Sequence, residues 1–586
     1  MNRTIKLSLI TFILAGGGNL ALADAVANAT NGGLISPLAN KQETISKDKI
    51  IISNTYQSPT DINHTGGVIT IGKATETHTI SDLNININNG SYLLFQGDLT
   101  LNKVNITNTK SQKFNLLFDN RNSDNKDIVF NESNLNGIKI DLWTNAVSNS
   151  KNLIFNKGTL NNVNIGSQTA SNGKIKDLNF KVVESEINSG NFSYKTTFVN
   201  SKLLGNISGN IVVDNSIVEA TLNTNTLEVI NGTTISSDIS KVNNFILDNS
   251  TLTTDLNAKN ITIKNDAKYN NKNITASGAL TIENHQIINN DKDKITLKSN
   301  GISTYKDSVI KNAVLDSNLN RIDFYNTNEL DNVKISNDNA WDVTKHHITI
   351  WDNTKVTIND SEIINSAINQ SASADFDSEV IINNTKLVDT GIGALNKNDL
   401  YTRIPKLELN NVNYINNVEN SGIFAKEITI NGGYIKANKL YGTDTFIVPG
   451  VNDISTQDNT KVIIKGGAII EALVDGEELE IYNSKLTGDS LITNIKTDNS
   501  ELIGKIEATN NIDISNSSIK GDIKGSELKL LNSDLNSNLI DIANNVIIEN
   551  TETKTITGNF KVGNDFKSSN TIIQGSINTT NNMELN

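Results

Sequence analysis

Apolar residues recur along this chain in the pattern apolar-x-apolar-x, and an Asn follows many of these pairs. Residues 245–252 read FILDNSTL, residues 227–234 read LEVINGTT and residues 261–268 read ITIKNDAK. Alternation with a period of two is typical of a β-strand that buries one face. The pattern therefore predicts a succession of short strands, each of which ends at a corner marked by Asn.

The spacing of these pairs is nearly constant in two parts of the chain. The residues that follow the pairs lie 15 to 19 positions apart between 184 and 299, and 14 to 18 apart between 432 and 564. A unit of about 17 residues is too short for a strand–helix pair or a propeller blade. It fits one rung of a parallel β-solenoid, in which each rung stacks on the last. We expect an all-β fold with rungs of about 16–18 residues.

Each unit also has an internal order, Asn-Ser-x-apolar-x-Gly-x-apolar. Residues 200–207 read NSKLLGNI and residues 483–490 read NSKLTGDS. Gly and Asn both tolerate a positive φ, as a tight corner requires. Stacked rungs would bring the Asn residues into one column at one corner, where their amides can hydrogen-bond from rung to rung. The predicted members of this corner column are Asn200, Asn215, Asn231, Asn249, Asn265, Asn483, Asn499, Asn516, Asn532 and Asn550.

The regularity of the units predicts how the chain is organised. Residues 24–85 are less regular and suggest an N-terminal cap with the first rungs, because a solenoid must cover its open edge. Residues 86–305 are expected to form a solenoid. Residues 306–425 are expected to continue it with longer loops, because the pairs there are as much as 27 positions apart. Residues 426–586 are expected to be regular solenoid followed by a polar tail.

The segment from Met1 to Ala23 has the features of a secretory signal peptide. A basic start, MNRTIK, precedes an apolar run, and Ala21-Leu22-Ala23 forms a small-x-small cleavage site before Asp24. The alternative is a short membrane anchor. We expect an exported chain, on the cell surface or outer membrane or in the medium.

Composition narrows the possible functions. The chain has 586 residues, a formal net charge of −13 and no Cys. Disulfides and thiol chemistry are therefore excluded, and binding to nucleic acid is not expected. An AT-rich genome would explain the abundance of Asn, Lys and Ile, but not their spacing. No motif for a cofactor is present, and we expect none.

Two short motifs resemble catalytic ones. Residues 488–491 read GDSL, but all five His precede Ser490, and Gly488 is the corner Gly of an ordinary unit. Arg321 and Asp323 are two positions apart, so alternation places them on one face, where we expect a surface ion pair. We therefore expect no enzyme.

The segment AWDVTKHHITIWDN, residues 340–353, is the best candidate for a ligand-binding surface. The candidate residues are Trp341, His346, His347 and Trp351. The two Trp rings could form an exposed platform for a sugar ring, or they could fill wide rungs or pack under a loop. Adjacent strand residues face opposite sides, so the two His cannot jointly hold a metal.

The signal peptide and the repeat together resemble the passenger region of bacterial autotransporters and related surface adhesins. The resemblance covers most of residues 86–565 and rests on the rung pattern, not on a fixed motif. Two-partner secreted adhesins share this pattern. The recurrence of G-x-I is also similar to that of bactofilins, which are short and cytoplasmic. It implies a right-handed β-helix on a Gram-negative surface, with a host-cell surface or glycan as partner. It also implies an outer-membrane translocator, in cis or in trans. Residues 566–586 do not look like its barrel strands, so the cis form would require a longer reading frame.

These observations favour an exported surface rod with an adhesive or structural display role. Two alternatives stay open: a secreted β-helix lyase or hydrolase that acts on polysaccharide, and a self-associating extracellular matrix protein.

Overall fold

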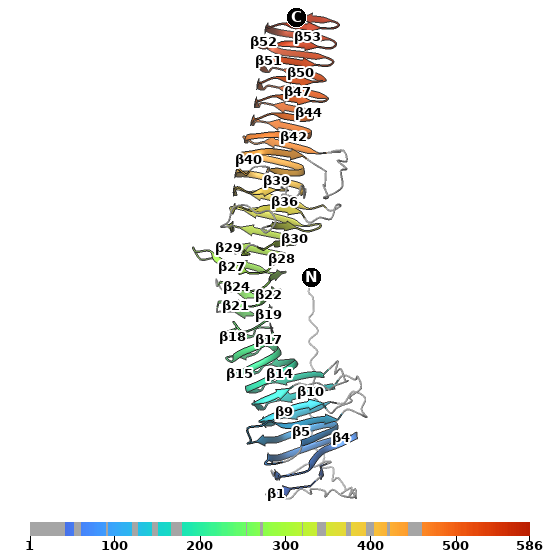
Figure 1. Cartoon of the computed structure of the whole chain (residues 1–586), viewed down its shortest axis with the longest axis vertical. Helices are drawn as coiled ribbons and strands as arrows, with labels where there is room; N and C mark the ends of the chain where they lie inside the picture. Colours follow the sequence, from blue (N-terminus) through green and yellow to red (C-terminus); the bar gives the residue numbers. More distant parts are fainter. Residues whose placement is uncertain are drawn as a thin grey trace, which may run out of the picture.

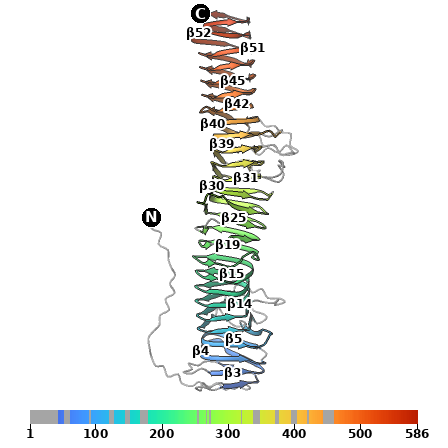
Figure 2. The ribbon, with the colours of Figure 1, turned by 90° about the vertical axis from the view of Figure 1, so that its left-hand side faces the viewer.

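In the computed structural model the chain forms one long parallel β-solenoid, which rises from the blue N-terminal coils to the red C-terminal coils (Figures 1 and 2). Among the residues that the structure describes, all 55 strands belong to a single sheet. The predicted all-β, parallel β-solenoid fold is confirmed. The hand of the helix stays a prediction.

The structure describes most of the chain, and every statement below concerns these residues. They are 42–47, 49–51, 60–89, 92–119, 127–142, 151–165, 178–252, 255–265, 267–269, 273–318, 320–336, 347–370, 377–393, 404–418, 422–442 and 460–586. In these segments no helix is long and apolar enough to cross a membrane.

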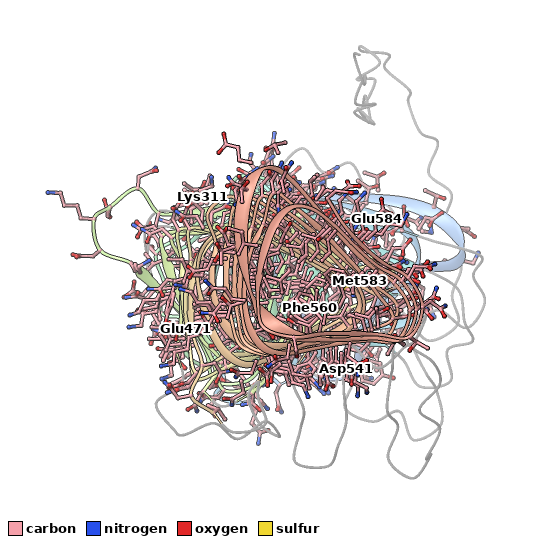
Figure 3. All side chains as sticks on the ribbon, turned by 90° about the horizontal axis from the view of Figure 1, so that it is seen from above. Lys311, Glu471, Asp541, Phe560, Met583 and Glu584 are labelled. Atoms are coloured by element: carbon pink, nitrogen blue, oxygen red, sulfur yellow. The ribbon has the colours of Figure 1, made fainter. Side chains whose placement is uncertain are left out.

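Each coil is a triangle with an apolar interior, as the end-on view in Figure 3 shows. In the coil that begins at residue 501, Leu502, Ile506 and Ile512 face inward, one on each side of the triangle. They stack on Ile519, Ile523 and Leu528 of the next coil. Apolar residues are thus two apart within a strand and four or five apart across a corner. This is the alternation that the sequence shows.

The N-terminal coils are long. Asn84 stacks on Asn105, and Asn105 on Asn134, so equivalent positions are 21 and then 29 apart. Their outward amides hydrogen-bond in series: Asn105 donates to Asn84 and Asn134 donates to Asn105, each at 2.8 Å. The strands are β1 (Gln42–Ile45), β2 (Lys49–Ile51), β3 (Thr60–His64), β4 (Val68–Ile87), β5 (Tyr92–Asn108), β6 (Phe114–Asp119), β7 (Ile128–Asn131), β8 (Asn134–Asn136), β9 (Ile138–Leu142), β10 (Lys151–Asn156), β11 (Thr159–Asn161), β12 (Val163–Ile165) and β13 (Leu178–Val183).

The next coils are shorter and more regular. Glu186 stacks on Lys202, and Lys202 on Ile217, so equivalent positions are 16 and then 15 apart. The strands are β14 (Glu186–Val199), β15 (Lys202–Asp214), β16 (Ile217–Val218), β17 (Thr221–Ile230), β18 (Thr234–Ile235), β19 (Asn244–Asp248), β20 (Thr251–Leu252), β21 (Leu256–Ala258), β22 (Asn260–Lys264), β23 (Lys268–Tyr269), β24 (Ile274–Ala276), β25 (Leu280–Glu283), β26 (Gln286–Ile288) and β27 (Ile295–Ser299).

The middle coils are wide. Leu330 stacks on Ile358 and Val380 on Leu407, so equivalent positions are 28 and 27 apart. The strands are β28 (Ser303–Lys311), β29 (Ala313–Asp316), β30 (Ile322–Asp331), β31 (Lys334–Ser336), β32 (His347–Ile350), β33 (Lys355–Asn359), β34 (Glu362–Ile364), β35 (Ala367–Gln370), β36 (Glu379–Asn383), β37 (Lys386–Val388), β38 (Gly391–Ile392), β39 (Ile404–Ile415) and β40 (Ile423–Gly442).

The C-terminal coils return to a short period. Leu486 stacks on Leu502 and Leu502 on Ile519, so equivalent positions are 16 and then 17 apart. The strands are β41 (Lys461–Lys465), β42 (Ile469–Tyr482), β43 (Lys485–Thr487), β44 (Ser490–Asp498), β45 (Glu501–Ile503), β46 (Ile506–Ala508), β47 (Asn511–Ser515), β48 (Ser518–Lys520), β49 (Ile523–Gly525), β50 (Glu527–Leu531), β51 (Asp534–Ile542), β52 (Val546–Val562), β53 (Phe566–Gln574), β54 (Ile577–Thr579) and β55 (Met583–Leu585).

The Asn corners occupy two corners of the triangle, and the prediction of one column was wrong. Glu283 stacks on Lys306, whereas Ile288, further along the same coil, stacks on Lys311. Asn200 to Asn265 precede Asn284 at the first corner, whereas Asn312 lies at the second. The second corner continues through residues 359, 383, 410, 431 and 465, which stack in turn, to Asn483. The similar octapeptides at 200–207 and 483–490 therefore lie on different sides of the coil.

The predicted corner residues adopt the left-handed conformation, with one exception. Nine of the ten have φ between 45° and 56°: Asn200, Asn215, Asn231, Asn249, Asn265, Asn483, Asn499, Asn516 and Asn532. Asn550 is not among the residues with positive φ. Leu531 pairs with Glu549 but Leu535 pairs with Ile556, so the chain is longer at this corner than in the coil before it. The longer connection makes the turn without a left-handed residue at 550.

A column of buried hydroxyls runs along part of each corner, from Ser185 to Thr233 at the first and from Ser484 to Ser533 at the second. The backbone N–H of Ser201 donates to Ser216 Oγ at 3.0 Å, and that of Ser216 donates to Thr233 Oγ1 at 3.2 Å. At the second corner the N–H of Ser500 donates to Ser517 Oγ at 3.1 Å, and that of Ser517 to Ser533 Oγ at 3.2 Å. These side chains are almost fully buried.

The amide column is interrupted. Asn215 Nδ2 donates to Asn200 Oδ1 at 2.8 Å, but Asn231 Nδ2 turns to Asp214 Oδ1 at 2.9 Å. The predicted amide bonds between corner Asn residues therefore occur at some coils only, and the following Ser or Thr adds the hydroxyl bonds.

Replacement of Ser216 by Ala is expected to lower the local free energy of unfolding by about 1–3 kcal/mol, because it leaves the buried N–H of Ser201 without an acceptor. The Ser216→Thr variant keeps the hydroxyl and should behave as the parent, since Thr233 fills the equivalent place. Amide hydrogen exchange of residues 199–235 measures the effect. Equal exchange in both variants would contradict the hydroxyl column.

Candidate ligand-binding surfaces

Only part of the surface predicted from residues 340–353 lies within the described residues. Trp341 and His346 lie outside them. His347 begins β32, but its side chain is outside the described part. Trp351 follows β32 and is half-buried. The predicted platform can therefore be examined only at Trp351.

Trp351 stacks on Tyr325 of the preceding coil. The ring centroids are 5.2 Å apart and the planes differ by 13°. Phe324 pairs with Ile350, so the two rings occupy equivalent positions in successive coils. The guanidinium carbon of Arg321 lies 5.5 Å from the centre of the Trp351 ring. Trp351 is thus in contact with Tyr325 and Arg321 of the preceding coil, and the sugar platform stays a prediction.

Arg321 and Asp323 form the expected ion pair, but the carboxylate is buried. The Nη2 atom of Arg321 donates to Asp323 Oδ2 at 2.9 Å, and Nε lies 2.6 Å from Oδ1. Asp323 is 2% exposed. Burial, and then the charge of Asp323, raises the pKa of the Tyr325 phenol. This cluster joins two wide coils.

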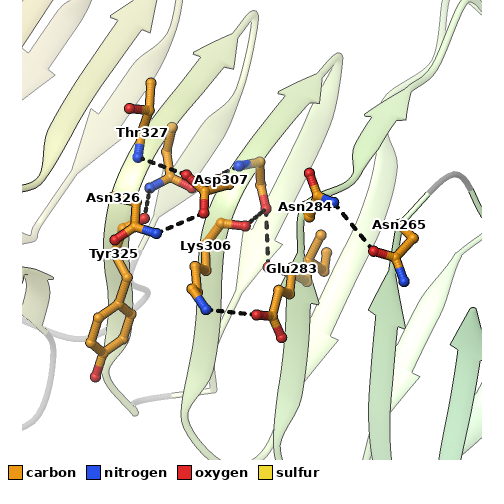
Figure 4. Close-up of polar contacts among 11 residues, drawn as sticks. Asn265, Glu283, Asn284, Lys306, Asp307, Tyr325, Asn326 and Thr327 are labelled. Atoms are coloured by element: carbon orange, nitrogen blue, oxygen red, sulfur yellow. Dashed lines mark hydrogen bonds and ion pairs between the residues drawn. The ribbon is translucent and has the colours of Figure 1, made fainter. Parts of the chain in front are cut away.

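The outward side of the same coils carries a network of polar contacts (Figure 4). Lys306 Nζ donates to Glu283 Oε1 at 2.7 Å, and this bond raises the pKa of Lys306. Asn326 Nδ2 donates to Asp307 Oδ2 at 2.7 Å, and Asn284 Nδ2 to Asn265 Oδ1 at 3.2 Å. These polar groups bond to neighbouring coils and hold the register there.

The serine of the GDSL tetrapeptide faces the core. Ser490 is 1% exposed and stacks between Val474 and Ile506. Gly488 has φ of 143°, and a Cβ at this position would overlap the carbonyl oxygen of Ala472. In this structure the hydroxyl is out of reach of a substrate, and Gly488 is a corner residue. Among the described residues, no group of three or more His, Cys, Asp or Glu is placed to hold a metal ion.

Opposite charges alternate from coil to coil on the outward faces. Glu379 lies between Lys355 at 2.8 Å and Lys406 at 2.5 Å, and Glu362 lies between Lys334 at 3.4 Å and Lys386 at 2.8 Å. Hydrogen bonds from Lys355 and then Lys406 hold the pKa of the Glu379 carboxyl below its ordinary value. Such pairs favour correct stacking and leave these faces without a field of one sign.

The depressed pKa of Glu379 predicts an acid-sensitive section of the rod. A carboxyl whose pKa is lower in the folded chain stabilises it above the unfolded pKa of about 4.3, and this stability is lost as the pH falls through the folded pKa. Hydrogen exchange in β33, β36 and β39, corrected for intrinsic rates, should rise as the pH falls below about 4. In the Glu379→Gln variant this rise should be smaller. A rise of the same size in the variant would show that another group is responsible.

Two shallow grooves follow the corners of the rod. The first has a volume of about 850 Å³ and extends from Glu132 to Ile217 at the first corner. The second has a volume of about 510 Å³ and extends from Gly467 to Lys554 at the second corner. Sequence reasoning missed both, because it placed the two sets of Asn at one corner.

Comparisons with known proteins add no family to this description. The chain matches no protein-family model, no curated protein and no solved structure. The β-solenoid is therefore established by the structure, and the likeness to autotransporter passengers rests on the repeat pattern and the signal-like N-terminus.

Proposed function

We propose that this chain is an exported surface rod, similar to the passenger region of autotransporters, with an adhesive or structural display role. The single observation that carries the proposal is the unbroken parallel sheet from β1 to β55. Each coil is joined to the next by backbone hydrogen bonds, side-chain columns and a shared core, which makes a stiff spacer. The features of a signal peptide in residues 1–23 support export.

In display, the rod holds its binding surfaces at a distance from the cell and exposes them to a partner. Stacked strands add about 4.8 Å of length per coil. Charge-paired faces such as those around Glu362 and Glu379 disfavour non-specific association with other charged surfaces. Binding energy then comes from particular surfaces along the rod, with a host-cell surface or a glycan as partner. Export would use an outer-membrane translocator, either in the same polypeptide or as a separate protein.

Protease treatment of intact producing cells tests this proposal. External protease should remove the chain while a cytoplasmic marker stays intact, and the intact mass of the native product should distinguish a translocator in cis from one in trans. A product heavier than this chain indicates the cis arrangement. Protection of the chain until the cells are lysed would overturn surface display.

The two alternatives have assays of their own. Calcium-dependent depolymerisation of uronate polymers by the purified chain would support a polysaccharide-active enzyme. Fibre growth that increases with protein concentration would support a self-associating matrix protein. Neither result is expected for a display rod.

A further inference from the structure

The two grooves share one arrangement of side chains although they lie at different corners. The first contains Asn200-Ser201-Lys202, and the second contains Asn483-Ser484-Lys485. In each, the next coil contributes a second corner Asn, which is Asn215 in the first groove and Asn499 in the second. Two positions on different sides of the rod thus present the same local surface.

The hydrogen bonds of the two grooves are also equivalent. Asn215 Nδ2 donates to Asn200 Oδ1 at 2.8 Å, and Asn499 Nδ2 donates to Asn483 Oδ1 at 2.6 Å. The next corner Asn in each series turns away to an Asp of the preceding coil: Asn231 to Asp214, and Asn516 to Asp498.

Because Asn231 and Asn516 bond to Asp residues, one amide N–H group and one amide oxygen stay available for a ligand in each groove. The Nδ2 groups of Asn200 and Asn483 donate no hydrogen bond within the described chain, and the Oδ1 atoms of Asn215 and Asn499 accept none. Each groove therefore offers one amide donor and one amide acceptor, one coil apart.

The charges that line the grooves are mixed in sign, with one excess negative charge in the first groove and none in the second. In the first groove Lys157 lies 3.6 Å from Glu184. In the second, Lys485 lies 3.0 Å from Glu501, and Lys554 lies 3.1 Å from Asp534. Neither lining has a large excess of one sign, so neither gives a strong field to attract a polyanion or a polycation.

Backbone N–H groups in the grooves already donate hydrogen bonds to neighbouring coils. The N–H of Lys202 donates to Ser185 O at 2.9 Å, and the N–H of Glu501 donates to Ser484 O at 3.0 Å. An extended peptide cannot add there as another strand, because strand addition needs free backbone groups. A ligand must be recognised by side-chain amides, hydroxyls and ion pairs.

We propose that the two grooves bind segments of a neutral, linear polysaccharide and that the rod is therefore bivalent. A sugar hydroxyl both donates and accepts a hydrogen bond, which matches the paired amide donor and acceptor. A polymer lying along the corner crosses Asn200 and Asn215 in the first groove, or Asn483 and Asn499 in the second, on successive coils. The biological setting of this binding rests on the proposed display function, but the binding itself is a property of the purified chain.

Native electrophoresis of the purified full chain tests the proposal, in gels that contain neutral linear glucans, mannans or galactans. At least one neutral polymer should retard the chain. The variant with Asn200→Gly and Asn215→Gly, and the variant with Asn483→Gly and Asn499→Gly, should each bind at least tenfold more weakly, because loss of one site removes the gain from bivalency. The four-residue variant should show no retardation. Gly keeps the positive φ of these corners, so the fold is retained.

The matched control replaces Asn249 and Asn265 by Gly, at the first corner but outside the lining of the first groove. This control should bind as the parent does. Absence of retardation by every neutral polymer, equal weakening in control and groove variants, or stronger retardation by polygalacturonate would each overturn the proposal. If the chain binds a neutral polymer but is not displayed on cells, the binding grooves stand and the display role is wrong. If the chain is displayed but binds no neutral polymer, the display role stands and the binding grooves are wrong.

Discussion

Replacement of Gly504 by Val is expected to open the C-terminal coils locally. Gly504 has φ of 143°, and a Cβ there would overlap the carbonyl oxygen of Gly488. Gly521, one coil later, meets the carbonyl oxygen of Gly504 in the same way. A β-branched side chain adds strain at the corner and overpacking between coils, at a combined cost of roughly 2–5 kcal/mol. The atoms that a Cβ of residue 504 would overlap belong to the backbone of residue 488, so the overlap cannot be relieved by movement of a flexible side chain.

Hydrogen exchange in β43 to β48 measures this effect, because a solenoid opens locally and a single global midpoint is poorly defined for it. Gly467 provides the control. It also has a positive φ, of 78°, but a Cβ there meets nothing within 4 Å. The Gly467→Asn variant should therefore exchange as the parent does. Similar exchange in the two variants would contradict the stacked-glycine explanation.

Replacement of Arg321 by Ala is the second large effect that we expect. It leaves the carboxylate of Asp323, which is 2% exposed, without its partner. Removal of one partner from a buried ion pair costs roughly 3–5 kcal/mol. The Arg321 side chain is 40% exposed, so part of this cost is relieved by water, and we expect roughly 2–4 kcal/mol.

Hydrogen exchange of β30 and β32 is the measurement for this variant. A second variant that combines Arg321→Ala with Asp323→Asn removes the unpaired charge and should recover much of the loss. If the double variant is no more stable than the single one, the stacking of Arg321 over Trp351, and not the charge of Asp323, is the larger contribution.

The strands could be predicted from the sequence because alternation is a local property. In FILDNSTL the side chains of Phe245 and Leu247 face the core in β19, and Asn249 makes the corner. The fold class follows from many such stretches at a near-constant spacing. The local alternation and the stacking of coils favour the same strands, so the repeat could be recognised in the sequence.

The identity of each corner could not be predicted, because it depends on contacts between coils. The same Asn-Ser signal marks both corners, and only the pairings of Glu283 with Lys306 and of Ile288 with Lys311 separate them. The contact between Tyr325 and Trp351 was hidden for a similar reason. The two residues are 26 positions apart, and this distance identifies a stacked pair only when the length of that coil is known.

The equivalence of Asn499 and Asn516 at one corner also bears on how such a chain can change over evolutionary time. Deletion of residues 499–515 would join Asp498 to Asn516, which occupies the position of Asn499 in the preceding coil. Ser517 would then replace Ser500 in the hydroxyl column. Recombination between the similar gene segments that encode neighbouring coils can therefore shorten or lengthen the rod in whole-coil steps without a new corner, whereas an insertion of any other length must form a loop.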